Sequence, residues 1–208
     1  LTTSIVLIVL GTVLLKFTEH ISWMGAFFHS ISARTAGFST YSIGEFTNAG
    51  LFVLCVLMFI GASPGSTGGG IKTSTFFVLA QSTRSMFSKQ AVGAFKRSIS
   101  SQNVSKAYAI SMLSALVVIV ATFLLCVLEP EFQFIQLLFE VISAFGTVGL
   151  STGITPDLSG AGKLVIILVM FIGRLGAMTL ISMWIERPEK MIRYTEETIA
   201  IGHLDKKG

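Results

Sequence analysis

The chain has 208 residues, of which 52% are hydrophobic and only 12% are charged, and its mean hydropathy is +0.77. This composition is too apolar for an ordinary soluble domain and is typical of a protein solvated by lipid. The net charge of +4 is modest, and nothing in the sequence resembles a nucleic-acid-binding surface, a catalytic triad or a metal-ligand cluster. Cys55 and Cys126 lie inside apolar runs, so they predict neither a disulfide framework nor a metal site.

The first half of the chain begins with residues 1–15, which are predicted to form a membrane-spanning helix rather than a signal peptide, because a charged leader region is missing. Residues 23–34 reach only about 20 Å as a helix, which is too short to span, so we predict a re-entrant helix there. A buried helix of a soluble core is the alternative. Residues 48–60 and 74–86 are predicted half-helices.

The second half contains the most clearly predicted helix, residues 107–128, which carry no charge and reach roughly 33 Å. Residues 132–146 are again apolar and too short to span, which predicts a second re-entrant helix. Residues 161–185 are long enough to cross a membrane, although they carry Lys163 and Arg174.

Basic residues predict the orientation. The loop between residues 84 and 106 carries Arg and Lys but no acidic residue, which places it in the cytoplasm by the positive-inside rule. The tail after Ile185 holds Arg187, Lys190, Arg193, Lys206 and Lys207 and falls on the same side by chain parity, whereas Glu129 and Glu131 fall outside. Both re-entrant segments are therefore expected to enter the membrane from the external face.

An internal repeat relates the two halves. FHSISARTAGFST begins at Phe28 and FEVISAFGTVGLST begins at Phe139, and Thr35 aligns with Thr147 at a spacing of 112 residues (147 − 35). The same spacing places MFIG at residues 58–61 on MFIG at residues 170–173. The chain is therefore predicted to be a tandem duplication of helix, re-entrant helix, Thr-x-Gly loop and helix.

Each Thr-x-Gly loop follows a re-entrant helix whose carbonyl end carries partial negative charge. A glycine at the centre permits unusual backbone angles, so backbone carbonyls can face a dehydrated cation. A pair of ordinary turns is the alternative interpretation. We predict two walls of a cation selectivity filter, formed by Thr35, Ala36, Gly37 and Phe38 and by Thr147, Val148, Gly149 and Leu150.

The stretch GASPGSTGGGIKTST, residues 61–75, comes within one residue of a Walker A motif, because Ile71 separates Gly70 from Lys72. The repeat places its start at the depth of the membrane centre, which favours a broken helix over a nucleotide site. A passive loop is the alternative to a gate beneath the filter. The predicted gate residues are Gly61, Ser63, Pro64, Gly65, Ser66, Thr67, Gly68, Gly69, Gly70 and Lys72.

Two arginines and one glutamate complete the predicted site. Arg174 aligns with Ala62, and an ionisable residue at that depth predicts a function, either bonding carbonyls of the loop or presenting charge to the pore. Arg34 is expected to support the filter by capping the first re-entrant helix or by pairing with Glu140. His20, His29 and His203 show no ligand spacing and are interpreted as ordinary polar residues.

The sequence resembles the Trk/Ktr/HKT superfamily of potassium transporters, and most closely the bacterial Ktr-type membrane subunit. The resemblance rests on ARTAGFST, LMFIGASPGSTGGGIKTST, GTVGLST, FIGRLG and IRYTEETIAIG. It implies an all-α membrane protein containing the third and fourth of four pore repeats. The other two walls must then come from a longer polypeptide or from a second copy.

The predicted organisation is a pore repeat at residues 1–86 with an intramembrane loop at 61–73, a cytoplasmic linker at 87–106, a second repeat at 107–186 and a cytoplasmic tail at 187–208. The resemblance further implies a multi-pass protein of the bacterial plasma membrane, a homodimer surrounded by lipid, and a cytoplasmic ring of nucleotide-binding RCK/KTN subunits. Such a ring would dock on residues 84–106 and on the tail from Glu186. The expected ion is K⁺, with Na⁺ as a candidate co-ion, and no organic cofactor or nucleic acid is expected.

Three functions are compatible with these patterns. The favoured one is potassium uptake through a selective pore with glycine at the centre of both visible walls, rather than an enzymatic activity. A coupled secondary cation transporter with its substrate site at the broken helix is the second, and saturable flux with co-ion dependence would identify it. A membrane ATPase using residues 65–73 is the third, and nucleotide binding that depends on Lys72 would identify it.

Overall fold

The protein is described by a computed structural model that covers residues 2–66, 68–88, 93–94 and 97–176. Within these ranges the chain is mostly helical, which confirms the all-α part of the predicted fold class. The predicted linker adds two short strands, because β1 (Gly93–Ala94) pairs antiparallel with β2 (Arg97–Ser98). Thr67 of the predicted gate and the predicted tail 187–208 lie outside the described residues.

The first half of the chain contains four α-helices and the short 3-10 helix η1 (Ile43–Glu45). The α-helices are α1 (Thr2–Thr18), α2 (Trp23–Ser32), α3 (Asn48–Phe59) and α4 (Thr73–Ser88). Hydroxyl side chains cap the N-termini of α2 and α3. Ser22 Oγ accepts from Gly25 N at 3.0 Å, and Thr47 Oγ1 accepts from Gly50 N at 3.1 Å.

The second half contains α5 (Ser101–Leu128), α6 (Phe134–Phe145), the 3-10 helix η2 (Thr155–Asp157) and α7 (Gly160–Leu175). Ser100 caps α5, so this helix begins six residues before the predicted position 107 and includes the end of the predicted linker. Among the described helices, α5 alone is long and apolar enough to cross a membrane by length and composition. Its outward face is apolar, as Met112 (80% exposed) illustrates.

The prediction of one continuous helix over residues 161–185 is wrong, because the helix ends within the described residues. α7 ends at Leu175, and Gly176 follows with φ 80°, a left-handed value that breaks the helix. The sixteen residues of α7 reach only about 24 Å. Residues 177–185 of the predicted span lie outside the described residues.

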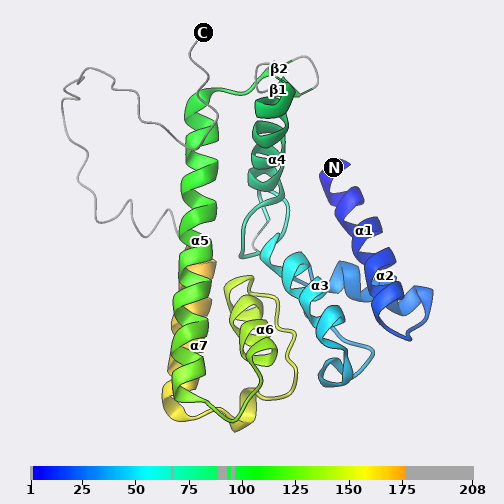
Figure 1. Cartoon of the computed structure of the whole chain (residues 1–208), viewed down its shortest axis with the longest axis vertical. Helices are drawn as coiled ribbons and strands as arrows, with labels where there is room; N and C mark the ends of the chain where they lie inside the picture. The colour runs from blue at the N-terminus through cyan, green and yellow to red at the C-terminus, as the bar shows by residue number, and fades with distance from the viewer. Residues whose placement is uncertain (1, 67, 89–92, 95–96, 177–208) are drawn as a thin grey trace, which may run out of the picture.

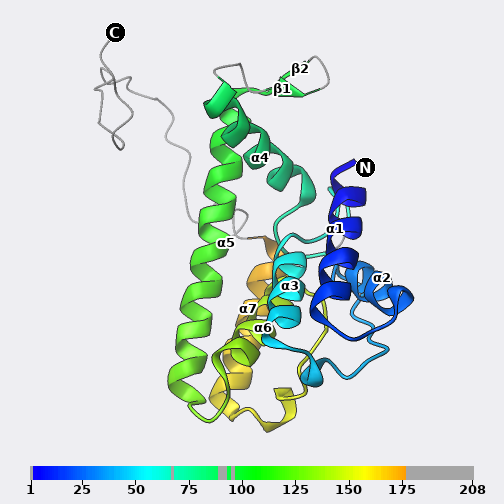
Figure 2. The same cartoon turned by 45° about the vertical axis from the view of Figure 1, so that its right-hand side comes forward.

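The helices pack around α3 and α6. α3 contacts α6 and α1, while α6 contacts α5 and α7, so the two halves of the chain meet along α3 and α6. α5 runs along one side of the molecule with α7 beside it, and α1 and α2 lie on the opposite side (Figure 1, Figure 2). The core is apolar and includes fully buried Leu54, Met58, Leu125 and Phe139.

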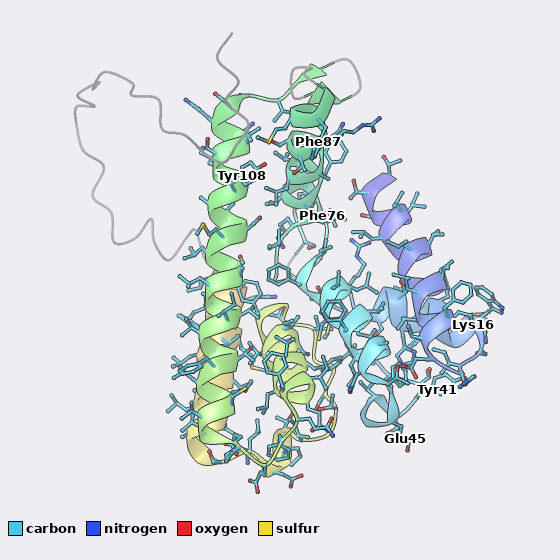
Figure 3. The ribbon with its side chains drawn as sticks, viewed as in Figure 1. Lys16, Tyr41, Glu45, Phe76, Phe87 and Tyr108 are labelled. Atoms are coloured by element: carbon cyan, nitrogen blue, oxygen red, sulfur yellow. The ribbon has the colours of Figure 1, made fainter. Side chains whose placement is uncertain are left out.

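Different helix connections lie at the two ends of the molecule. Lys16, Tyr41 and Glu45 lie near the connections of α1, α2 and α3 at one end, while Phe87 and Tyr108 lie on the α4 and α5 arm at the other (Figure 3). The short helices α2 and α6 stop inside the fold, between these ends. The chain segments that follow them therefore start inside the fold, where the candidate site lies, and the first of them reaches the surface at Phe38 (70% exposed).

Candidate functional site

The loops after α2 and α6 share an unusual backbone. Thr35 has φ 75° and Thr147 has φ 50°, and these are the non-glycine residues with positive φ in the described part of the chain. Gly37 (φ 77°) and Gly149 (φ 94°) follow two residues later in each loop. A left-handed β-branched residue costs about 1–3 kcal/mol and persists only where its surroundings hold it.

A buried serine near the end of each short helix holds the loop that follows. Ser32 O accepts from the amides of Ala36 (3.0 Å) and Gly37 (3.1 Å), and Ser32 Oγ donates to Phe38 O. In the second half, Ser143 O accepts from Val148 N at 2.9 Å. Ser143 Oγ donates to Leu150 O at 2.6 Å, the position matching Phe38 at the 112-residue spacing. Both loops are therefore fastened to their helices in the same manner.

The two loops touch each other, although they are far apart in the sequence. A Cβ placed on Gly37 would overlap Val148 O and lie 3.5 Å from Gly149 Cα. A Cβ on Gly149 would meet Gly37 Cα at 3.9 Å. The structure thus brings together the two segments that the sequence predicts as filter walls.

The predicted break between two half-helices agrees with the structure. α3 ends at Phe59 and α4 begins at Thr73, and we call the segment between them, residues 60–72, the intramembrane loop. Its ends are drawn together by a bond from Ile71 N to Phe59 O (3.1 Å). Lys72 Nζ donates to Ser66 O (3.2 Å) and to Gly68 O. The lysine thus bonds carbonyls of its own loop, whereas a Walker A lysine reaches phosphates.

The intramembrane loop contacts both Thr-x-Gly loops. Gly69 N donates to Thr147 Oγ1 at 2.8 Å. A Cβ on Gly68 would lie 2.8 Å from Thr35 Oγ1, which is buried and has no hydrogen-bond partner within the described residues. The glycines of the intramembrane loop are therefore needed for its close approach to the two threonines.

The predicted pairing of Arg34 with Glu140 is wrong. Arg34 donates from Nη1 to Ser4 O (3.1 Å) and from Nη2 to Ser4 Oγ (3.4 Å), so its guanidinium joins the end of α2 to α1. Both oxygens of Glu140 accept from side chains or the backbone of residues 151–155. Each residue therefore supports its own half of the site.

Arg174 lies in the last turn of α7, where its side chain is exposed. It lies close enough to Lys72 for the two positive charges to repel each other. The structure therefore places Arg174 beside the intramembrane loop, as the 112-residue spacing predicts. Its bonding to the carbonyls of that loop stays a prediction.

Sequence reasoning missed two buried glutamates that fix α3 and α7. Glu19 (8% exposed) accepts from Thr47 N at 2.9 Å and Thr47 Oγ1 at 2.7 Å, and Glu129 (2% exposed) accepts from Ser159 N at 2.9 Å. Both carboxylates therefore lie at helix N-termini, which carry partial positive charge. The caps Thr47 and Ser159 obey the 112-residue spacing, but the glutamates are 110 residues apart, so a single spacing does not align them.

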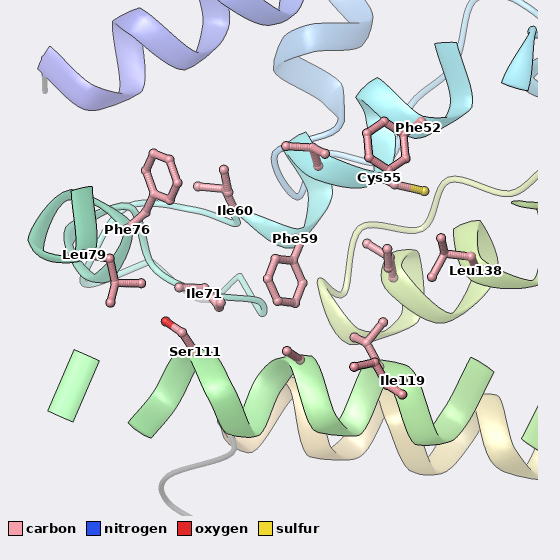
Figure 4. Close-up of a pocket in the computed structure, with 14 residues that line it drawn as sticks. Phe52, Cys55, Phe59, Ile60, Ile71, Phe76, Leu79, Ser111, Ile119 and Leu138 are labelled. Carbon is pink, nitrogen blue, oxygen red and sulfur yellow. The ribbon is translucent and has the colours of Figure 1, made fainter. Parts of the chain in front are cut away.

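A cavity of about 420 Å³ lies beside the intramembrane loop. Side chains from α3, α4, α5 and α6 line it, and all but Ser111 are apolar. Ile60 and Ile71, at the two ends of the intramembrane loop, form part of its wall (Figure 4). The loop thus has the two threonines on one side and unfilled apolar space on another.

These features are those of a helical membrane transport protein: short helices ending inside the fold, irregular backbone at their ends, and a glycine-rich loop against that backbone. The family model for TrkH, described as a cation transport protein, matches residues 1–193. The chain belongs to this family of cation transport proteins.

Three curated relatives are similar over most of the chain. It is 46% identical to the Ktr system potassium uptake protein B of Vibrio alginolyticus, over 86% of this chain and 40% of that protein. It is 42% identical to the Ktr system potassium uptake protein D of Bacillus subtilis, over 84% and 39%. It is 41% identical to the potassium/sodium uptake protein NtpJ of Enterococcus hirae, over 92% and 44%. The chain thus spans about two fifths of the length of these relatives.

A solved structure supports the fold. The potassium transporter TrkH from Vibrio parahaemolyticus superposes with a TM-score of 0.68 at 23% identity, covering 88% of this chain and 42% of that one. At this identity the likeness concerns the arrangement of helices alone.

Proposed function

We propose that this chain forms part of a selective pore through which potassium is taken up across the bacterial plasma membrane. The observation that carries the proposal is the contact between two loops with left-handed threonines and glycines at the ends of helices α2 and α6. The names of the relatives, which specify potassium or potassium and sodium uptake, are in agreement with it.

The two loops can bind a cation through their backbone carbonyls. Their amides at Ala36, Gly37 and Val148 bond back to serine carbonyls of their own helices, so they do not face the space between the loops. The C-terminal ends of α2 and α6 add partial negative charge at the same place. Residues 35–38 and 147–150 then form two of the four walls that surround a dehydrated ion.

The remaining walls come either from a longer polypeptide or from a second copy of this chain. In the first case residues 1–86 and 107–186 are the third and fourth of four pore repeats. Homodimers and a cytoplasmic RCK/KTN ring are part of the proposed assembly, with docking on residues 84–106 and on the tail from Glu186. The apolar outward face of α5 is suited to contact with lipid.

The intramembrane loop is proposed to be the gate. In the described conformation it lies against both threonines, held by the bond between Gly69 N and Thr147 Oγ1. Its amide N–H then points at a hydroxyl of the proposed inner filter, where a cation would be repelled. Lys72 and Arg174 add positive charge nearby, which also repels a cation below the filter. Opening therefore requires the loop to move away from the filter.

Ion uptake by cells that lack their own potassium uptake systems tests this function, with the protein expressed at its full encoded length. Potassium influx that exceeds sodium influx and needs no opposing or accompanying co-ion gradient supports the pore. Saturable flux that vanishes without a co-ion gradient would instead support a coupled transporter whose substrate lies between α3 and α4.

Filling the cavity beside the gate is expected to slow uptake. Ala115 lines the cavity from α5, and a phenylalanine there would occupy space that the loop needs when Ile60 and Ile71 move outward. We expect Ala115→Phe to lower the potassium influx several-fold while the ratio of potassium to sodium influx stays unchanged.

Met112→Phe is the matched control, because Met112 lies on the same helix but is 80% exposed. Both variants are compared at equal amounts in the membrane. An unchanged influx in Ala115→Phe would show that the loop does not use the cavity.

A further inference from the structure

His29 is a buried histidine that belongs to neither the proposed filter walls nor the proposed gate. It lies in α2, is 0% exposed, and has its Nδ1 at 2.9 Å from Gly25 O. Because a carbonyl can only accept, Nδ1 donates its proton to Gly25 O. Nε2 lies 3.2 Å from Ser39 Oγ, and the Ser39 hydroxyl donates to Tyr41 O.

Glu140 makes the corresponding connection in the second half with more bonds. It lies in α6 and is 5% exposed. Its Oε1 accepts from Ser151 Oγ (2.7 Å), Thr152 N (2.9 Å) and Thr152 Oγ1 (3.1 Å), and its Oε2 accepts from Thr155 Oγ1 (2.8 Å). The carboxylate thus fixes the chain that leaves the second Thr-x-Gly loop.

His29 and Glu140 occupy matching places. Each follows a phenylalanine and precedes by three residues the serine, Ser32 or Ser143, that holds its loop. Each reaches the residue two positions after the loop glycine, Ser39 in one half and Ser151 in the other. A histidine in one half and a glutamate in the other therefore connect the short helix to the chain that leaves its Thr-x-Gly loop.

We propose that His29 and Glu140 are positioning residues for ion selectivity, each fixing the outer end of one filter wall from its own helix. The inference rests on the proposed function. Neither side chain touches the ion. Each prevents its loop from shifting relative to the helix, and carbonyls that shift bind ions of different size less discriminately. The wall at residues 35–38 is the less firmly held, because a single hydrogen bond joins His29 to Ser39, whereas Glu140 accepts four bonds.

The test compares His29→Phe with His29→Gln in the uptake assay, at full encoded length and at equal amounts in the membrane. The glutamine amide, which has both a donor and an acceptor, can still hydrogen-bond Ser39 Oγ, whereas phenylalanine fills the same space without a hydrogen bond. We expect His29→Phe to lower the ratio of potassium to sodium influx about two- to tenfold, and His29→Gln to stay near wild type. His20→Phe, at an exposed histidine, is the control.

Ser39→Ala removes the hydrogen-bond partner of His29 at an exposed position. It tests the inference even if His29→Phe fails to reach the membrane. It is expected to lower the influx ratio like His29→Phe, and the double variant is expected to add nothing. An unchanged ratio in Ser39→Ala, or equal damage from glutamine and phenylalanine at position 29, would overturn the inference. Gly37→Ser is measured in parallel to separate the two proposals. An unchanged ratio of potassium to sodium influx in Gly37→Ser would reject the filter itself. A lowered ratio in Gly37→Ser together with an unchanged ratio in Ser39→Ala would reject only the role of His29.

Discussion

Replacing Gly37 with serine is expected to lower the selectivity for potassium over sodium by at least about tenfold, which corresponds to about 1.4 kcal/mol. Gly37 has φ 77°, where a residue with a Cβ is strained by roughly 1–2 kcal/mol. In addition, a Cβ at this position would overlap Val148 O of the neighbouring loop. One carbonyl of the second wall must therefore move, and the measurement is the ratio of potassium to sodium influx.

Gly149→Ser provides an internal comparison for this prediction. Gly149 is also left-handed, at φ 94°, but a Cβ there meets only Gly37 Cα at 3.9 Å. Gly149→Ser is therefore expected to lower selectivity in the same direction but by less than Gly37→Ser. Equal selectivity in both variants and in wild type, with normal amounts in the membrane, would mean that the two loops are scaffold.

Replacing Gly173 with alanine is expected to destabilise the protein and to abolish most uptake. Gly173 is buried in α7, and a Cβ there would overlap Phe145 O at the C-terminal end of α6, with Phe145 C at 2.7 Å. Backbone atoms of a helix end cannot yield as a flexible side chain does, so α7 must move away from α6. Overpacking of this kind costs about 1–3 kcal/mol, which lowers the apparent Tm by about 2–12 °C.

Gly160→Ala in the same helix is the control for this effect, because nothing lies within 4 Å of a Cβ placed on Gly160. Thermal unfolding of the two purified variants in detergent gives the comparison. A Gly173→Ala protein that unfolds at the same temperature as Gly160→Ala would contradict the close contact between α6 and α7.

Hydropathy and helix-breaking residues sufficed to predict most helices of this chain. Residues 107–128 lie within α5, and the Gly, Ser and Pro content of residues 61–73 predicted the break between α3 and α4. These predictions succeed because they depend on local composition alone. The same approach placed the end of α7 too late, since Gly176 is a single residue within an apolar run.

Side-chain partners between distant segments were harder to predict. Arg34 reaches Ser4 on α1, thirty residues away, and a charge-based pairing with Glu140 was the wrong alternative. The match of His29 with Glu140 requires a spacing of 111 residues, because FHSISARTAG is one residue shorter than FEVISAFGTVG before the loop threonine. A single spacing of 112 therefore finds the loops but not the residues that brace them.

Crystals of the protein at its full encoded length, grown with rubidium or thallium in place of potassium, test the central claim most directly through anomalous density. We predict density peaks between the carbonyls of residues 35–38 and 147–150, above the intramembrane loop. Density confined to the break between α3 and α4, with none between the two Thr-x-Gly loops, would contradict the filter and favour a coupled transporter.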